Sequence, residues 1–212
     1  MHLFLNGNKK ISNLATHNMK IRKNKTMKKL ILTVLVALSA IFSDAQTTVS
    51  GVKVDAKLAV DGQNLVLNGA GVREKFFMDM YVGSLYLTKK STDAKNIMAA
   101  NEGMAIKLNI VSGMITSDKM ISAINEGFEN STNKKTAPLK AKIDKFKGFF
   151  KEKINKGDVF IIAYDPTEGV VVYKNGSKKG SIDGLDFKKA LFGIWLCDKP
   201  ADDDLKEAML GK

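Results

Sequence analysis

One arginine stands among large apolar residues in the stretch LNGAGVREKFFMDMYVGSLYL, which runs from Leu67 to Leu87. A turn broken by glycines is expected to lead into the strand that carries this arginine, Arg73. Its guanidinium is a planar fork of donors that fits a carboxylate with two hydrogen bonds. Arg73 could therefore hold the anionic head of an amphiphile whose tail lies along the strand. The residues leave a second interpretation open, in which Arg73 is a solvated charge at a strand end.

Alternation along one long strand, residues 72–88, predicts which side chains share the face of Arg73. Phe77 and Tyr81 fall on that face, and we take both as further candidates for ligand binding. On a straight strand Arg73 and Tyr81 would lie roughly 26 Å apart, unless a bulge or turn at Glu74–Lys75 shortened the distance. Both faces carry large apolar groups, so a second sheet layer, helices or an apolar ligand must cover one of them.

The residue types exclude several kinds of chemistry. The two histidines, His2 and His17, come before residue 46, and the only cysteine is Cys197. Beyond residue 46 this rules out a Ser-His-Asp or Cys-His nucleophile and a zinc site made of His and Cys. Acid–base chemistry would have to use Lys, Tyr, Asp, Glu or water. We therefore expect no metal and no cofactor, and we expect Cys197 to serve in packing because no base is present to form its thiolate.

Residues 27–45, MKKLILTVLVALSAIFSDA, have the basic start, apolar middle and small-residue end of a secretory signal peptide. The apolar run from Leu30 to Phe42 is shorter than the ~20 residues that span a bilayer, although an uncleaved anchor is the alternative. We expect cleavage near Ala45 and export to the periplasm or the medium, with membrane contact only through the signal peptide. Residues 1–26 are interpreted as an upstream extension.

Removal of this leader changes the charge of the chain. The whole sequence carries a formal net charge of +12, but eight of its 34 Lys and Arg and one of its 22 Asp and Glu precede residue 46. The remainder therefore has a net charge of only about +5. Its lysines form no stripe and do not alternate with aromatic residues, so a nucleic-acid partner is not expected.

Residues 46–212 are expected to form a single α+β domain with a mainly antiparallel sheet backed by helices. The Asp61-Gly62 pair predicts a hairpin turn, and Asn175-Gly176 predicts another. A short helix is expected behind Ser91 or Thr92. Further strands are expected at 104–111, 157–165, 169–176 and 177–183, an amphipathic helix pair within 117–150, and two last helices at about 187–196 and 201–210.

Three segments resemble the chalcone isomerase-like family, and most of all its bacterial exported branch. They are the stretch quoted above, GDVFIIAYDPTEGVVVYKNG, and DFKKALFGIWLCDKPADDDLKEAML, and the resemblance spans roughly Val54 to Gly211. It implies an open-faced β-sandwich, and we expect the helix pair within 117–150 to lie over the open face. Some members of the family close a chalcone to a flavanone, and others bind fatty acids in the same cleft. In both, an arginine after the glycine turn meets the anionic end of the ligand, which corresponds to Arg73.

The resemblance also suggests catalytic positions, but only part of the set is kept. Tyr81 stands where the isomerases have a threonine, Thr116 where they have a tyrosine, and Ala123 where they have an asparagine. Candidates for catalysis are thus Arg73, Tyr81 and Thr116, and candidates for ligand binding are these three with Phe77.

The lost amide at Ala123 argues against isomerase activity. We therefore expect a non-catalytic protein that binds a fatty acid or a similar apolar carboxylate, with Arg73 at the anionic head. The alternatives are an intramolecular lyase of the chalcone–flavanone isomerase type and a structural or partner-binding domain whose cleft is filled by its own side chains.

Overall fold

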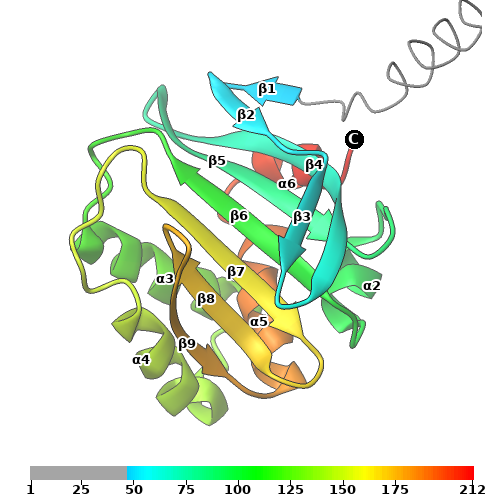
Figure 1. The fold of residues 1–212 in the computed structure, drawn as a ribbon. Coiled ribbons are helices and arrows are strands. Elements are labelled where there is room, and N and C mark those ends of the chain that lie inside the picture. The colour runs from blue at the N-terminus through cyan, green and yellow to red at the C-terminus, as the bar shows by residue number, and fades with distance from the viewer. Residues whose placement is uncertain (1–46) are drawn as a thin grey trace, which may run out of the picture. The chain divides into compact units, whose positions relative to one another are not determined.

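The computed structural model describes residues 47–212, so the predictions for the leader and its cleavage site lie outside the described residues. Seven strands form one sheet in which every strand pairs antiparallel with its neighbour in the sequence (Figure 1). They are β3 (Lys57–Val60), β4 (Gln63–Lys75), β5 (Met78–Leu87), β6 (Met104–Ile110), β7 (Val159–Asp165), β8 (Gly169–Lys174) and β9 (Ser177–Ile182). Before them, β1 (Thr47–Val49) and β2 (Val52–Val54) make a separate hairpin.

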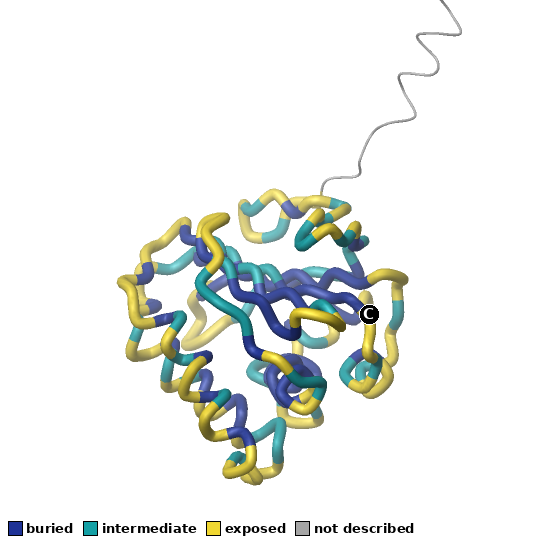
Figure 2. Tube along the Cα trace, turned by 60° about the horizontal axis from the view of Figure 1, so that its bottom comes forward, coloured by how far each residue is buried: buried dark blue, intermediate teal, exposed yellow. Residues whose placement is uncertain are grey.

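The helices gather on one side of the sheet, as Figures 1 and 2 show. They are α2 (Ala94–Ala99), α3 (Ser117–Ser131), α4 (Lys140–Gly148) with a 3-10 turn before it (Ala137–Leu139), α5 (Leu185–Leu196) and α6 (Asp203–Met209). The predicted α+β fold with an antiparallel sheet backed by helices is therefore confirmed. Most of the large buried side chains lie between the two layers.

Helix α5 forms the centre of the helical layer, and it is apolar on almost every side. Residues 187–196 are all buried except Lys189. Glycines allow it to approach α3 closely, because a Cβ on Gly127 would lie 2.7 Å from Ile194 and one on Gly193 would lie 2.7 Å from Ser131. A helix that is apolar all round belongs in the interior of a domain.

One charged side chain is fully buried within this layer. Lys188 donates from Nζ to the carbonyl oxygens of Ile97, Met98 and Ala100 at 2.7, 3.0 and 2.8 Å, at the C-terminal end of α2. Burial lowers the pKa of Lys188 to about 8, so the ammonium remains the main form at neutral pH. It supplies donors to carbonyl groups that the end of a helix leaves without partners.

The strand β3 and the segment before it cover part of the second face of the sheet. There the Tyr86 hydroxyl donates to the Asp55 carbonyl oxygen at 2.9 Å, and Leu58 and Val60 of β3 pack against the buried cluster that contains Tyr86. The segment that joins β2 to β3 therefore crosses this face. Beneath it Leu65 and Tyr86 are fully buried. This arrangement explains why both faces of β5 are apolar.

The prediction of one strand over residues 72–88 was wrong. Phe76 and Phe77 adopt left-handed backbone angles, with φ of 53° and 62°, and turn β4 back into β5. The glycines of GAGVR were also misread as a turn, since they lie inside β4. The residues of this stretch have high β-propensity, so composition alone did not reveal the turn at Phe76 and Phe77.

Helix starts were predicted less accurately than helix positions. The residue that caps α2 is Asp93, whose carboxylate accepts from the Asn96 N–H, and not Ser91 or Thr92. Helix α5 begins at Leu185, just after Gly184, and α6 begins at Asp203 behind the cap Asp202. Each of these positions is two residues or fewer from the expected one.

The glycines of β4 and β5 allow α6 to lie directly on the strands. A Cβ on Gly69 would come within 2.1 Å of the Ala208 carbonyl oxygen, and one on Gly71 within 2.6 Å of the Ala208 Cβ. On β5, a Cβ on Gly83 would lie 2.5 Å from Met209. Side chains at these positions would push the last helix away from the sheet.

We expect Gly69→Ala to lower the free energy of unfolding by about 2–4 kcal/mol, because the added methyl group meets a backbone oxygen that cannot move alone. Urea denaturation would measure the loss. Gly148→Ala is the matched control, since nothing lies within 4 Å of the position that a Cβ would take there. Equal stability of the two variants would contradict this account of α6 packing.

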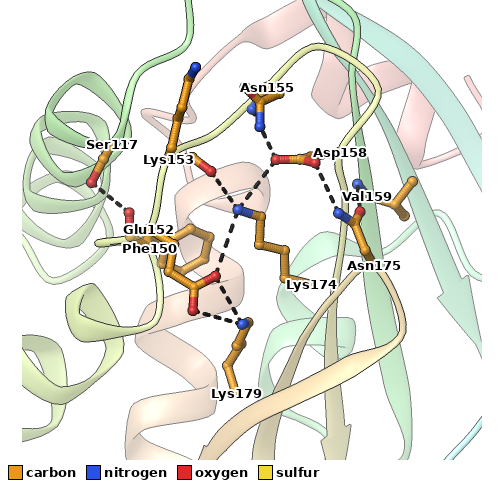
Figure 3. Close-up of polar contacts among 10 residues, drawn as sticks. All are labelled: Ser117, Phe150, Glu152, Lys153, Asn155, Asp158, Val159, Lys174, Asn175 and Lys179. Carbon is orange, nitrogen blue, oxygen red and sulfur yellow. Dashed lines mark hydrogen bonds and ion pairs between the residues drawn. The ribbon is translucent and has the colours of Figure 1, made fainter.

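A polar network fastens the loop between α4 and β7 to the sheet (Figure 3). Lys174 of β8 is 9% exposed, and its ammonium lies 3.3 Å from Asp158 and donates to the Lys153 carbonyl at 2.6 Å. The same loop accepts a hydrogen bond at the Phe150 carbonyl from the Ser117 hydroxyl, at 2.6 Å. Because Ser117 begins α3, the network also fixes the start of that helix.

The carboxylate of Asp158 is held in its charged form by this network. Burial favours the neutral form, but hydrogen bonds from the Asn175 side chain and the Asn155 N–H, both 2.9 Å, together with Lys174, outweigh burial and lower the pKa of Asp158. Such a group stabilises the fold fully above the pKa of the unfolded chain, and the contribution is lost as pH falls through the lower folded value.

We expect Asp158→Asn to reduce the free energy of unfolding by about 1–3 kcal/mol at pH 7, because Lys174 loses the nearer of its two charged partners and keeps only Glu152, at 3.9 Å. The difference from the wild type should shrink below about pH 4, where the wild-type carboxyl itself takes up a proton. Urea denaturation across pH would measure both, with the exposed Asp183→Asn as control. A difference that persisted unchanged at low pH would contradict this assignment.

Candidate functional site

A β-bulge in β5 brings the predicted site residues together. Arg73 pairs with Tyr81 while Glu74 pairs with Asp79, so Met80 has no partner on β4. The extra residue resets the alternation, and both Met80 and Tyr81 therefore face the helical side of the sheet. The Arg73 Cζ lies 5.8 Å from the centre of the Tyr81 ring. The separation of roughly 26 Å expected for a straight strand is thus corrected by the turn and the bulge.

The bulge also positions the loop that leads into α3. The Met80 carbonyl oxygen accepts hydrogen bonds from the Val111 and Ser112 N–H groups at 3.1 and 3.2 Å. This loop then carries Met114 and Ile115 opposite the strands. Both walls of the space in front of Arg73 are consequently set by one backbone irregularity.

The space between the β4–β5 turn, this loop and α3 is a cleft of about 330 Å³. Its wall is mostly apolar and rich in methionine, whose flexible side chain adapts to ligands of different shape. The wall contains Met78, Met80, Met114, Ile115, Met120 and Ala123, and the rim contains Lys75, Phe76, Asp118, Lys119, Ser122 and Glu126. This volume lies at the lower end of the range for small-molecule sites, about 300–1,000 Å³.

Arg73 and Tyr81 lie at the inner end of the cleft. Next to them is a second void of about 30 Å³, which shares Arg73, Tyr81, Met120 and Ala123 with the cleft and is lined by core residues that include Phe146 and Trp195. The two polar side chains therefore lie, with Met120 and Ala123, between an apolar cleft and an apolar core. A ligand that enters the cleft meets them last.

The guanidinium of Arg73 lacks an anionic partner among residues 47–212. Its side chain makes no hydrogen bond or ion pair there, its one ring contact is with Tyr81, and its Nε is buried without an acceptor. A buried donor left without an acceptor costs about 1–3 kcal/mol. An anionic group bound in the cleft would complement a charge that no described carboxylate neutralises by direct contact.

Tyr81 is oriented by a residue that sequence reasoning did not select. The Trp195 Nε1–H donates to the Tyr81 hydroxyl oxygen at 3.0 Å, which leaves the hydroxyl proton free to donate in its turn. Burial raises the pKa of Tyr81, against the opposing effects of Arg73 and of the Trp195 hydrogen bond. The phenol is therefore a donor at neutral pH. An indole N–H can only donate, so a buried Trp in the helix FGIWL was the available signal that an acceptor lies nearby.

The structure does not bring the other two predicted residues into the cleft. Phe77 is fully exposed at the tip of the β4–β5 turn, because the strand that would have pointed it inward ends there. Thr116 caps α3, where its hydroxyl accepts from the Lys119 N–H at 3.3 Å. Ala123 does line the cleft, and its methyl group offers no hydrogen bond there.

Other functional groups are sparse around the site. No cluster of three or more His, Cys, Asp or Glu side chains that could hold a metal occurs within residues 47–212. Cys197 follows the last turn of α5, and its carbonyl oxygen accepts from the Lys206 ammonium at 2.9 Å. Among the helices that the structure describes, none is long and apolar enough to cross a membrane.

Comparisons with known proteins agree with this architecture. The family model described as chalcone isomerase-like matches residues 46–211. A search of curated proteins gave no match. Among solved structures, a fatty-acid binding protein of Arabidopsis thaliana matches with a TM-score of 0.61 and 17% sequence identity, over 76% of this chain and 92% of that one. At this identity the likeness establishes the fold. With its matched family model and its curled antiparallel sheet backed by helices, the chain belongs to the chalcone isomerase-like family.

Proposed function

We propose that this protein binds a fatty acid or a similar apolar carboxylate without transforming it. The tail lies in the methionine-rich cleft, and the carboxylate reaches Arg73 and Tyr81 at its inner end. The observation that carries the proposal is the Arg73 guanidinium, which faces an apolar cleft with a buried Nε and no anionic partner among the described residues. The Arabidopsis relative by fold, which is named as a fatty-acid binding protein, lends support.

Burial of the tail would supply most of the affinity. Each Å² of apolar surface removed from water contributes roughly 25 cal/mol before the costs of binding are subtracted. The head group would add specificity, because a fork of two N–H groups and one phenol O–H fits a carboxylate better than a neutral group. An apolar ligand without an acid would leave these donors unsatisfied.

The cleft geometry favours binding over chalcone isomerisation. Thr116, one candidate to orient a water, uses its hydroxyl to cap α3. The amide expected from the isomerases is replaced by the methyl group of Ala123. Tyr81 and Arg73 remain, and both serve equally well as donors to a carboxylate. The open cleft in turn supports binding over the alternative of a domain filled by its own side chains.

We also propose that the mature protein is exported. The pattern of residues 27–45 supports this, with cleavage near Ala45 and the domain released into the periplasm or the medium. Mass spectrometry of the protein recovered from cell fractions tests the idea. A chain that retains residues 1–45 in the cytoplasmic fraction would refute export without affecting the binding proposal.

To test the binding site, the full chain is expressed, and the form that accumulates is purified gently and extracted with solvent for mass spectrometry. The wild type should release an apolar acid in stoichiometric amount. Arg73→Ala should raise the Kd for a fatty acid about 10- to 100-fold, because a charge-assisted hydrogen-bonded contact is lost. Lys145→Ala removes one positive charge from an exposed site on α4 and is the matched control. Unchanged affinity in a folded Arg73→Ala protein would refute the proposal.

Tyr81→Phe should weaken fatty-acid binding about tenfold, because the carboxylate loses one donor. Since the pKa of Tyr81 is raised, its phenol stays protonated between about pH 6 and 9. Titration of Tyr81 should therefore cause no change in the fatty-acid affinity of the wild type over this range. Titration calorimetry at several pH values would measure both effects. Tyr173→Phe is the control, as its hydroxyl bonds to Asp61 away from the cleft. A similar loss of affinity in both variants would point to a general effect on folding.

A further inference from the structure

The large exposed apolar side chains of the described chain gather at one place. Phe76, Phe77 and Met78 lie on the β4–β5 turn, and Met114 lies on the loop before α3. Phe76 is 78% exposed and Phe77 is fully exposed. Phe76, Met78 and Met114 also line the cleft. The patch is therefore continuous with the mouth of the proposed ligand site.

The backbone of this turn is unusual when it is compared with the other hairpins of the same chain. Four two-residue turns have left-handed φ at both positions, namely Ser50-Gly51, Asp61-Gly62, Phe76-Phe77 and Asn175-Gly176. Three of them carry a small or polar residue followed by glycine, which is the usual choice for this geometry. Two phenylalanines are strained there and expose their rings to water. Turn formation therefore does not explain these residues.

The charged side chains around the turn are divided between the two faces of the sheet. Lys75 faces the cleft, as Arg73 does, with its ammonium 5.6 Å from the Phe76 ring. Glu74 alternates to the opposite face, beside its cross-strand partner Asp79, which accepts a hydrogen bond from Ser50. On α3, the rim carries Lys119 together with Asp118 and Glu126. The tip itself thus combines two aromatic rings with one cation on the cleft side.

We propose that the β4–β5 turn docks the cleft mouth onto a phospholipid bilayer. Phe76 and Phe77 enter the boundary between head groups and acyl chains, where their exposed rings are removed from water. The Lys75 ammonium stays at the level of the lipid phosphates. A fatty acid can then pass from the bilayer into the cleft without crossing water. This inference rests on the proposed function for the identity of the ligand, but the docking itself does not.

Vesicle flotation tests the docking, with the full chain and with vesicles of phosphatidylcholine or of phosphatidylglycerol. The wild type should bind both, because the two phenylalanines supply the main contact in either case. The vesicle partition coefficient of Phe77→Gly should be about tenfold or more below that of the wild type. The same variant should unfold about 2–4 °C higher, since glycine relieves the strain at this position. Phe77→Trp should keep the binding and shift its fluorescence to the blue on vesicles.

A second measurement follows the transfer of a fluorescent fatty acid from vesicles to the protein. Phe77 does not line the cleft, so Phe77→Gly should bind the dissolved fatty acid with unchanged Kd but take it from vesicles several-fold more slowly. All variants share residues 1–46, and mass spectrometry establishes which N-terminus each purified protein has. Differences between variants therefore report on the turn.

Three results would overturn the docking proposal. They are no binding of the wild type to either vesicle, binding that Phe77→Gly leaves unchanged, and a change of oligomeric state in Phe77→Gly, which would make the patch an interface between two copies. Vesicle binding without any affinity for dissolved fatty acid would refute the proposed ligand and leave the docking intact. The two proposals can therefore fail separately.

Discussion

The cleft depends on a single extra residue in β5. Met80 has no partner on β4, and this bulge changes which side chains point toward the helices. Without it, Met80 and Tyr81 would lie on opposite faces of the sheet, and only one of them could line the cleft. The freed carbonyl of Met80 also holds the backbone that leads to α3. The two walls of the cleft are thus linked through one peptide group, so they keep a fixed separation.

The inner end of the cleft joins the two layers of the domain. Tyr81 comes from the sheet and Trp195 from α5, and their hydrogen bond crosses the interface between strands and helices. The apolar surroundings strengthen this bond, because competing water is excluded. The position of the phenol therefore depends on the packing of α5. The position of α5 depends in turn on its close approach to α3 at Gly127 and Gly193.

The sequence predicted the fold well because its strongest signals are local. Asp61-Gly62 and Asn175-Gly176 are turns in the structure, and the helical spacing of Met120, Ile124 and Phe128 corresponds to buried positions of α3. The site was harder to predict, because it depends on pairing between strands. The Phe76-Phe77 turn carries residues that favour strands, so only the observed register shows that Arg73 and Tyr81 are neighbours.

The misplaced candidates show the same limit in two further ways. Alternation placed Phe77 beside Arg73, but alternation holds only as long as the strand continues. Thr116 stands at the N-terminal cap of α3. Its hydroxyl oxygen accepts a hydrogen bond from a backbone N–H of that helix and is therefore not available to a ligand. Trp195 was overlooked because its partner is 114 residues away along the chain, and no local pattern records such a contact.

The order of the strands has a consequence for how the chain folds. Each strand of the large sheet pairs with the next one in the sequence, and the loops of the β3–β4, β4–β5, β7–β8 and β8–β9 hairpins are short, whereas β6 and β7 are joined through α3 and α4. The core cannot close in this way, because α5 and α6 come last and cover strands formed much earlier. Until α5 and α6 have been made, the helical layer lacks its central helix. The helical layer can therefore be completed only late in synthesis, after every strand of the sheet has been made.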